Sequence, residues 1–188
     1  HIIFTLSKRN FYNNFFYKQA DFVLTPSMES KQELISHWID EKKIWILQNP
    51  LTVPDDVKIE KIYKNKLGSN NILYVWRLSR EKNIDLALRV FKKISSVFHD
   101  LNFLIIWDGP AKQETSELIK KLWLTKKVKM LWKIPHEDLI RSDIFQNCKF
   151  FLTCSTSETF GITLIEANYF GLPVLWINQW WVWEVVID

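Results

Sequence analysis

The sequence predicts an α/β protein whose larger part is a doubly wound parallel sheet. Short, continuous apolar runs alternate with amphipathic stretches of roughly 10–15 residues along nearly the whole chain. Continuous apolar strands are typical of a parallel sheet that helices cover on both faces. The alternation is interrupted once, by a Pro- and Lys-rich stretch over residues 51–71. We therefore expect two α/β units joined by a linker.

The first unit is expected over residues 1–50. Its strands are predicted at short apolar runs, and its helices where apolar residues recur at helical spacing. Ser27 directly precedes such a stretch and is a suitable helix N-cap. The expected elements are a strand at Ile2–Leu6, a weak helix at Asn10–Gln19, a strand at Phe22–Thr25, a helix at Met28–His37 and a strand at Ile44–Leu47.

The second unit is expected over residues 72–188, where the alternation is cleaner. Because ligands bind outside the carboxyl ends of the strands in doubly wound sheets, the segments that follow each strand are the candidate sites. The expected strands are Ile72–Val75, Phe103–Ile106, Val128–Leu131, Phe150–Thr153 and Val174–Ile177, and the expected helices are Ile84–Phe98, Ala111–Leu122, Glu137–Phe145 and Ile162–Phe170.

The composition excludes several classes of protein. Of the 188 residues, 47% are hydrophobic and 24% are charged, which is typical of globular proteins and not of disordered, collagen-like or coiled-coil chains. No apolar run reaches the ~18 residues that a membrane-spanning helix needs. The net charge of +4 suits an anionic partner, but the lysines are dispersed and form no stripe with aromatic residues. We therefore expect no nucleic-acid partner.

The cysteines and the chain ends bear on localisation. Cys148 and Cys154 form no C-x-x-C pair, so we expect buried thiols in a reducing, cytoplasmic compartment. The chain begins without a basic segment ahead of an apolar stretch, so no signal peptide is predicted. It lacks an initial Met and ends at Asp188 within a repeating pattern, which indicates a fragment.

Two basic residues flank the turn after the first strand of the second unit. Arg77 and Lys82 lie where backbone N–H groups and a helix dipole already favour anions. An arginine that binds bidentately and a lysine that acts as a point charge suit a diphosphate. The alternative is a solvated surface turn without a ligand.

Two carboxylates lie near the start of the helix that follows the fourth strand. Glu158 lies at the strand end and Glu166 lies within the helix, eight positions later, so both can face one cleft. Carboxylates in such a place suit pairs of sugar or ribose hydroxyls, and Gly161 between them permits close backbone approach to a phosphate. The alternative is that Glu158 is a first-turn charge and Glu166 a solvated helix residue.

These segments together resemble family 4 of the retaining glycosyltransferases, which have the GT-B fold of two Rossmann-like domains. The order and spacing of the matching stretches agree over nearly the whole chain. They are residues 20–27 (ADFVLTPS), 73–83 (LYVWRLSREKN), 106–110 (IWDGP), 157–167 (SETFGITLIEA) and 171–174 (GLPV). The resemblance implies that residues 1–50 end an acceptor-side domain and that residues 72–188 form a donor-binding domain, truncated at its carboxyl end.

The resemblance also implies a reaction and a set of site residues. The activity would transfer a sugar from a nucleotide-sugar donor to a sugar, lipid or polysaccharide acceptor with retention of configuration. Arg77 and Lys82 would bind the diphosphate, Glu158 the donor sugar and Glu166 the ribose. Backbone groups of Phe160 and Gly161 would meet the sugar or phosphate. Three further positions of the donor site are Thr159, Ile162 and, against the base, Ile134.

No cofactor and no metal is expected, because the chain has no D-x-D motif and its four histidines are scattered. Members of such a family often dock on the cytoplasmic membrane face, so peripheral membrane contact is a further expectation. Two alternatives remain open at this point. One is a non-catalytic nucleotide-binding or scaffolding relative of the same fold, and the other is a nucleotide-sugar epimerase.

Tryptophan and glycine occur in unusual numbers. The chain has 10 Trp and 4 Gly, whereas glycine averages ~7% of residues in proteins. The resembling family has glycine in turns, which we expect after strands, where this chain has Trp38, Trp76, Trp107, Trp132, Trp180, Trp181 and also Trp123. We hypothesise that the source reads UGA as glycine and that UGA is written here as Trp. The alternative is a Trp-rich, degenerate relative with a blocked donor site.

Overall fold

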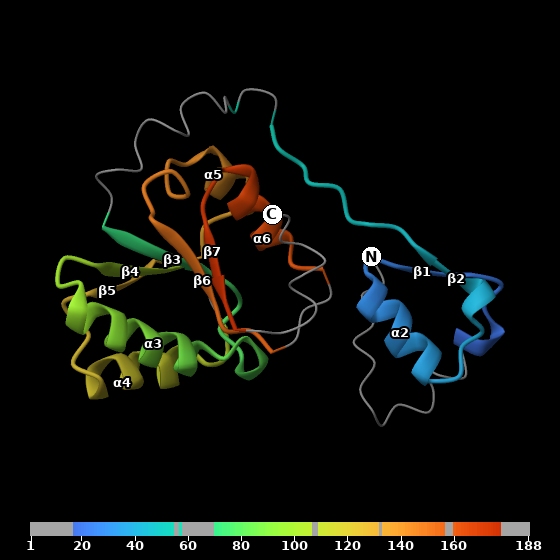
Figure 1. Cartoon of the computed structure of the whole chain (residues 1–188), viewed down its shortest axis with the longest axis horizontal. Helices are drawn as coiled ribbons and strands as arrows, with labels where there is room; N and C mark the ends of the chain where they lie inside the picture. The colour runs from blue at the N-terminus through green and yellow to red at the C-terminus, as the bar shows by residue number, and fades with distance from the viewer. Residues whose placement is uncertain are drawn as a thin grey trace. The chain divides into compact units, whose positions relative to one another are not determined.

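A computed structural model describes residues 17–54, 57, 70–106, 109–131, 133–156 and 160–177. Contacts along the chain divide it into two compact units, residues 1–50 and residues 51–188 (Figure 1). The strand expected at Ile2–Leu6 and most of the helix expected at Asn10–Gln19 lie outside the described residues. So does most of the expected linker, although Val53 and Val57 pack against the core of the second unit.

The described part of the first unit contains two strands and a helix. β1 (Val23–Thr25) and β2 (Ile44–Ile46) pair in parallel, and α2 (Met28–Ser36) and the short 3-10 helix η1 (Glu41–Lys43) connect them. Ser27 is the N-cap of α2, as predicted, because its side chain accepts a hydrogen bond from the Ser30 N–H at 3.1 Å. Val23, Leu34, Ile39 and Ile44 form a small apolar core.

The second unit is a five-stranded parallel sheet with helices on both faces. Its strands lie in the order β5-β4-β3-β6-β7. They span β3 (Asn71–Val75), β4 (Asn102–Ile106), β5 (Val128–Leu131), β6 (Phe150–Thr153) and β7 (Val174–Trp176). The helical elements are η4 (Arg80–Lys82), α3 (Ile84–Val97), α4 (Lys112–Lys121), α5 (His136–Arg141) and α6 (Ile162–Tyr169). In Figure 1, α3 and α4 cover one face of the sheet, and α5 and α6 lie on the other.

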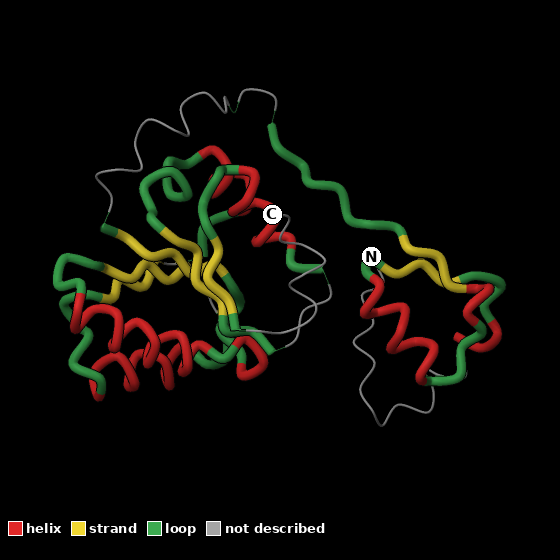
Figure 2. The backbone as a smooth tube through the Cα atoms, viewed as in Figure 1, coloured by secondary structure: helices red, strands yellow, loops and turns green. Residues whose placement is uncertain are grey.

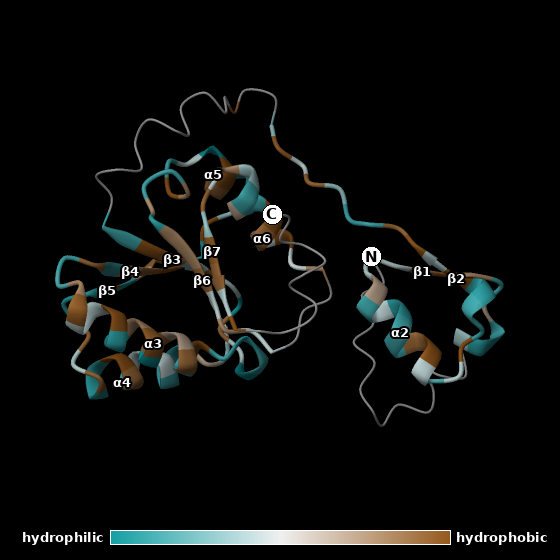
Figure 3. Cartoon of the chain, viewed as in Figure 1, coloured by the Kyte–Doolittle hydropathy of each residue, from teal (hydrophilic) through white to brown (hydrophobic). Residues whose placement is uncertain are grey.

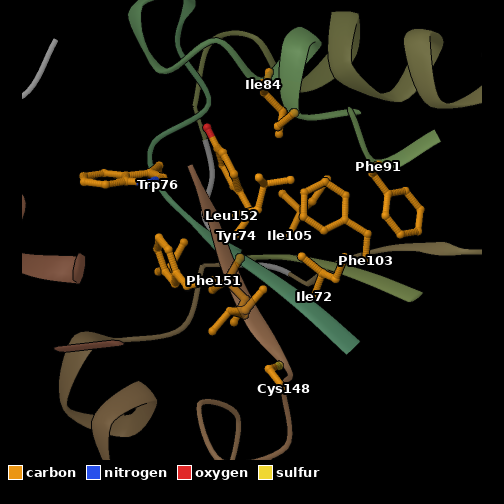
Figure 4. Packing of buried hydrophobic residues seen from close by; sticks show 14 of the residues in the cluster. Ile72, Tyr74, Trp76, Ile84, Phe91, Phe103, Ile105, Cys148, Phe151 and Leu152 are labelled. Carbon is orange, nitrogen blue, oxygen red and sulfur yellow. The ribbon is translucent and has the colours of Figure 1, made fainter. Parts of the chain in front are cut away.

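The core of this unit lies around the central strand. Residues Ile72–Val75 are fully buried, as continuous apolar strands in a doubly covered sheet must be. Phe91 from α3 stacks on Phe103 from β4 with ring centroids 5.0 Å apart, and Figure 4 shows the two rings beside Tyr74. Hydropathy follows the same pattern, with apolar strands and apolar stripes along the helices (Figure 3).

The predicted fold class is confirmed, and most predicted elements lie at the expected residues (Figure 2). One helix is shorter than predicted, because α5 ends at Arg141 and not at Phe145. Ser142 is extended, and its hydroxyl donates to the Leu139 carbonyl at 2.7 Å and accepts from the Ile144 N–H at 3.4 Å. The serine side chain therefore replaces the backbone bonds of a further helical turn.

The location predicted for two tryptophans is also wrong. Trp38 and Trp123 were expected after strands, but they follow α2 and α4 directly after each helix ends. Both have a left-handed backbone, with φ of 65° and 61°. Only Trp76, at the end of β3, has the expected placement among the described residues of that group.

Candidate functional site

The direction in which the chain winds reverses at the centre of the second unit. The chain winds outward from β3 through β4 to β5 and then returns to β6 on the other side of β3. The connections after β3 and β6 therefore leave the sheet in opposite directions, which is the point where doubly wound sheets bind ligands. Four of the predicted site residues that the structure describes, Arg77, Lys82, Phe160 and Gly161, lie in these two connections.

Hydrogen bonds hold the two connections together. The Thr156 N–H donates to the Glu81 carbonyl at 3.1 Å, and the Thr156 hydroxyl donates to the same oxygen at 3.2 Å. The Ser155 hydroxyl lies 3.4 Å from it. The segment after β6 is thus anchored on η4, within one residue of Lys82. The residues between Thr156 and Phe160, which include the predicted Glu158 and Thr159, lie outside the described residues.

The connection after β4 packs against the same region. Gly109 lies so close to Leu78 that a Cβ atom on it would fall 2.4 Å from the Leu78 carbonyl oxygen. The Ala111 N–H donates to that oxygen at 3.0 Å. Glycine is required here because of close backbone approach, and the contact fixes the turn that carries Arg77.

The charges on the β3 connection are mixed. Arg77 is exposed, and Lys82 is half-buried. The Ser79 hydroxyl donates to Glu81 Oε1 at 2.6 Å. This bond, together with backbone hydrogen bonding, holds the pKa of Glu81 below its ordinary value. Burial opposes this effect, and the nearby Lys82 and Arg77 charges support it. The negative charge of Glu81 would therefore repel an anion bound at Lys82.

Trp76 lies directly beside Lys82. The Lys82 Nζ atom is 4.8 Å from the centroid of the indole ring, within cation–π distance. The indole is 7% exposed and meets Phe151 edge to face (Figure 4). Its Nε1 is buried and has no hydrogen-bond partner among the described residues, although a buried indole N–H usually has one. The indole thus fills space at the lysine that was predicted to bind the diphosphate.

The helix α6 begins directly after a glycine and has no side-chain cap. Gly161 is the N-cap of α6, with φ of 71°, and no side chain caps the helix. The first N–H groups of a helix have no partner within it, and the helix dipole favours an anion there. Phe160 and Gly161 are buried, whereas Ile162 is exposed. The backbone geometry therefore suits a phosphate or sugar oxygen at the position predicted for Phe160, Gly161 and Ile162.

Glu166 is the most unusual residue of the site, because its carboxylate is completely buried. Its Oε1 lies 2.6 Å from His136 Nε2, and its Oε2 has no hydrogen-bond partner among the described residues. Burial raises the pKa of Glu166, and the hydrogen bond and charge of His136 oppose that rise. The expectation that Glu166 could be a solvated helix residue is therefore wrong, and a buried oxygen remains for a ligand hydroxyl.

His136 is the residue of this site that the sequence did not single out. It begins α5 and lies 30 positions from Glu166, so no local pattern joins the two. A weak signal was present, since Ile134, predicted beside the base, is only two residues away. Ile134 is half-buried and packs on the edge of the core. The pair brings the β5 connection and α6 together.

Comparison with known proteins adds evidence about the family of this chain. The family model described as "Glycosyl transferases group 1" matches residues 55–188. An uncharacterized glycosyltransferase of Methanocaldococcus jannaschii is 30% identical over 170 residues, which are 86% of this chain and 40% of that protein. The phosphatidylinositol N-acetylglucosaminyltransferase GPI3 subunit of Saccharomyces cerevisiae is 32% identical over 104 residues, 55% of this chain and 23% of that protein.

Solved structures match the fold at lower sequence identity. The pneumococcal O-GlcNAc transferase GtfA, in complex with UDP and GlcNAc, has a TM-score of 0.70 and 21% identity, covering 90% of this chain and 33% of that one. Anabaena HepE, in complex with UDP and glucose, has a TM-score of 0.71 and 19% identity, covering 90% of this chain and 47% of that one. The fold is that of GT-B glycosyltransferases. The chain spans less than half the length of these relatives.

Proposed function

This chain belongs to the glycosyl transferases group 1 family, and we propose that it supplies the nucleotide-sugar site of a retaining glycosyltransferase. The observation that carries the proposal is Glu166, a buried carboxylate with one oxygen bonded to His136 and the other without a described partner. Such an oxygen costs free energy until a ligand hydroxyl donates to it. The vicinal hydroxyls of a ribose are suitable donors, and Glu166 lies on the helix whose amino end would meet the phosphates.

The other site residues have complementary roles in this proposal. Arg77 and Lys82 bind the diphosphate, and the backbone at Phe160, Gly161 and Ile162 receives a phosphate or sugar oxygen. Ile134 packs against the base. Glu158 and Thr159, which lie outside the described residues, would hold the donor sugar. Two cations at the departing nucleoside diphosphate stabilise its growing negative charge, an effect of the order of 3–4 kcal/mol for comparable donors. Because these cations serve that purpose, we propose that the reaction needs no metal.

Two of the structural relatives support a uridine nucleotide. GtfA and HepE are described as complexes with UDP, and HepE also as a complex with UDP-glucose. We therefore propose a UDP-sugar as donor and a hexose derivative as the group transferred. The acceptor would be a sugar, lipid or polysaccharide used in surface glycan synthesis, at the cytoplasmic membrane face. No helix within the described residues is long and apolar enough to cross a membrane.

UDP binding by the full-length protein, measured by calorimetry, tests this proposal. We expect R77A and E166A to lose binding, because they remove a phosphate partner and a ribose partner. R89A, an equally exposed arginine on α3, is the matched control for R77A and should bind UDP like the parent protein. Unchanged binding in R77A and E166A would refute the site assignment. Sugar transfer from UDP-hexoses to extracted glycolipids is then the test of the activity.

One observation favours a second candidate function, a non-catalytic relative of the same fold. The Lys82 ammonium lies over the buried Trp76 indole, so in a chain with tryptophan at this position the lysine already has a partner where the diphosphate would bind. Such a protein would bind neither UDP nor UDP-sugars and would act through a protein partner. Failure of the parent protein to bind any nucleotide sugar, together with failure of W76G, would select this candidate over the transferase.

A further inference from the structure

Three helices of this chain end in the same backbone motif. After α2, α4 and α6, a residue with left-handed φ donates its N–H to the carbonyl three positions earlier, and the next residue donates to the carbonyl five positions earlier. This double bonding defines the Schellman motif. The first bonds are Trp38 to Ile35 at 2.9 Å, Trp123 to Lys120 at 3.0 Å and Gly171 to Asn168 at 2.8 Å; the second are Ile39 to Leu34 at 3.2 Å, Leu124 to Ile119 at 3.0 Å and Leu172 to Ala167 at 2.7 Å.

The three motifs share their backbone geometry, but the left-handed residue is tryptophan in two of them and glycine in the third. Their φ angles are 65° at Trp38, 61° at Trp123 and 61° at Gly171. The residue that follows is buried in all three cases, which is the apolar contact that accompanies this motif. At the end of α6, the left-handed position of the motif is occupied by glycine, Gly171. The ends of α2 and α4 have the same backbone geometry as this glycine.

Tryptophan gains nothing at these positions that would offset its strain. A left-handed backbone brings Cβ close to the following carbonyl oxygen, and glycine alone avoids this contact. The indoles of Trp38 and Trp123 are 84% and 89% exposed, so they bury little apolar surface. The backbone at positions 38 and 123 thus favours glycine, and no packing of the side chain favours tryptophan.

A third position shows a related conflict. Trp76 ends the central strand, where the backbone of a doubly wound sheet approaches its ligand. Its buried Nε1 has no partner among the described residues, and the Lys82 ammonium lies over its ring. The indole ring packs on Phe151, but the surroundings of position 76 leave its N–H without a partner among the described residues.

We propose that positions 38, 76 and 123 are glycine in the protein that the source organism makes, because a UGA codon is decoded there as glycine. A single reassigned codon accounts for 10 Trp beside only 4 Gly and for the left-handed tryptophans. The assignments at 38 and 123 are independent of the proposed function. At position 76 the inference deepens it, since glycine removes the indole from Lys82 and leaves bare backbone where the diphosphate would bind.

Peptide mass spectrometry of the protein isolated from its source tests this directly. Tryptic cleavage separates residues 32–42, 67–77 and 122–126, each containing one of the three positions. We expect every peptide to have the mass of the glycine form. Tryptophan at position 38 or 123 would overturn the codon assignment, and tryptophan at position 76 would overturn its consequence for the site.

Thermal unfolding of the full recombinant chain provides a second test. W38G and W123G should each raise the unfolding temperature by a few degrees, because each relieves left-handed strain. G171W places tryptophan in the third motif and should lower it. W45G is the matched control, because Trp45 is an exposed strand residue outside the left-handed region, and glycine there should destabilise. Lower unfolding temperatures for W38G and W123G would count against the proposal.

A binding measurement separates this inference from the proposed function. W76G should bind UDP about tenfold more tightly than the tryptophan form, since Lys82 no longer has to leave the indole. If the native peptides contain glycine but W76G binds no UDP, the codon assignment stands and the transferase proposal fails. If the native peptides contain tryptophan and the parent chain binds UDP, the transferase proposal stands and this inference fails.

Discussion

The His136 imidazole and the Glu166 carboxylate are joined across two elements that are far apart in sequence, with Nε2 and Oε1 2.6 Å apart. The histidine is half exposed, whereas the carboxylate has no exposed surface. The pair therefore connects solvent to a buried acid. His136 occupies one carboxylate oxygen, Oε1, and the other, Oε2, has no hydrogen-bond partner among the described residues. In the proposed donor site, His136 is accordingly a positioning residue.

Replacing His136 tests this positioning role. H136A leaves Oε1 of Glu166 without its partner, and an unsatisfied buried acceptor costs about 1–3 kcal/mol. The pKa of Glu166 should then rise further, because the imidazole contributes the opposing effect. We expect H136A to bind UDP more weakly than the parent protein. In a plot of UDP affinity against pH, the decrease at low pH should begin at a higher pH in H136A.

A conservative variant distinguishes positioning from packing. H136Q retains an amide N–H that can donate to Glu166, so it should recover part of the binding and of the pH profile. H99A changes an exposed histidine elsewhere in the unit and should leave both unchanged. A profile that does not move in H136A would show that the contact has no role in donor binding.

The pH dependence of stability tests the state of Glu166. Its folded pKa is raised above the ordinary value of 4.5, so the folded chain holds this proton more tightly than the unfolded chain. The stabilisation is fully present below pH 4.5 and is lost as pH rises through the folded pKa. The free energy of unfolding of the parent chain should therefore fall, relative to that of E166Q, as pH rises from 4 toward 8. A free energy of unfolding of the parent chain that rises relative to that of E166Q over this pH range would contradict the raised pKa.

Gly109 is a structural requirement of the site. In G109A, the new Cβ would meet the Leu78 carbonyl oxygen at 2.4 Å and the Leu78 nitrogen at 2.7 Å, so the backbone must move. Forced overpacking of this kind costs about 1–3 kcal/mol. We expect that loss in urea unfolding, with weaker UDP binding because the Arg77 turn shifts. P110A, at the exposed neighbouring position, should change stability by less than about 0.5 kcal/mol. Equal stability of G109A and P110A would rule out this close contact.

The sequence was most informative where one physical rule decides the structure. The predicted strands Val128–Leu131 and Phe150–Thr153 agree with β5 and β6 at both ends, and each begins directly after a lysine. Helix ends depend on side-chain bonds that compete with the backbone, so the stop at Ser142 was missed. The contact of His136 with Glu166 depends on strand order, which no local pattern contains. The left-handed φ of Trp38 and Trp123 could not be predicted from residue types that normally avoid it.

The two cysteines give a prediction that is independent of the donor site. Both were expected as buried thiols, and both are buried and form no disulfide. Burial raises the pKa of Cys154 to about 11, so its thiol is protonated at neutral pH and the reactive thiolate is scarce. Alkylation of the native chain by iodoacetamide at pH 8 should therefore be slow at Cys154.

Unfolding supplies the control for this prediction. In 6–8 M urea both thiols become accessible, so alkylation should become fast and reach the two cysteines that the chain contains. Because the folded pKa of Cys154 lies above the ordinary value of 9.0, the stability it contributes should be present below pH 9 and should be lost as pH rises through about 11. C154A removes that dependence without adding a titrating group. Fast alkylation of native Cys154 at pH 8 would contradict this prediction. It would show that the chain directly after β6 opens to solvent, although Ser155 and Thr156 are hydrogen-bonded to Glu81 there.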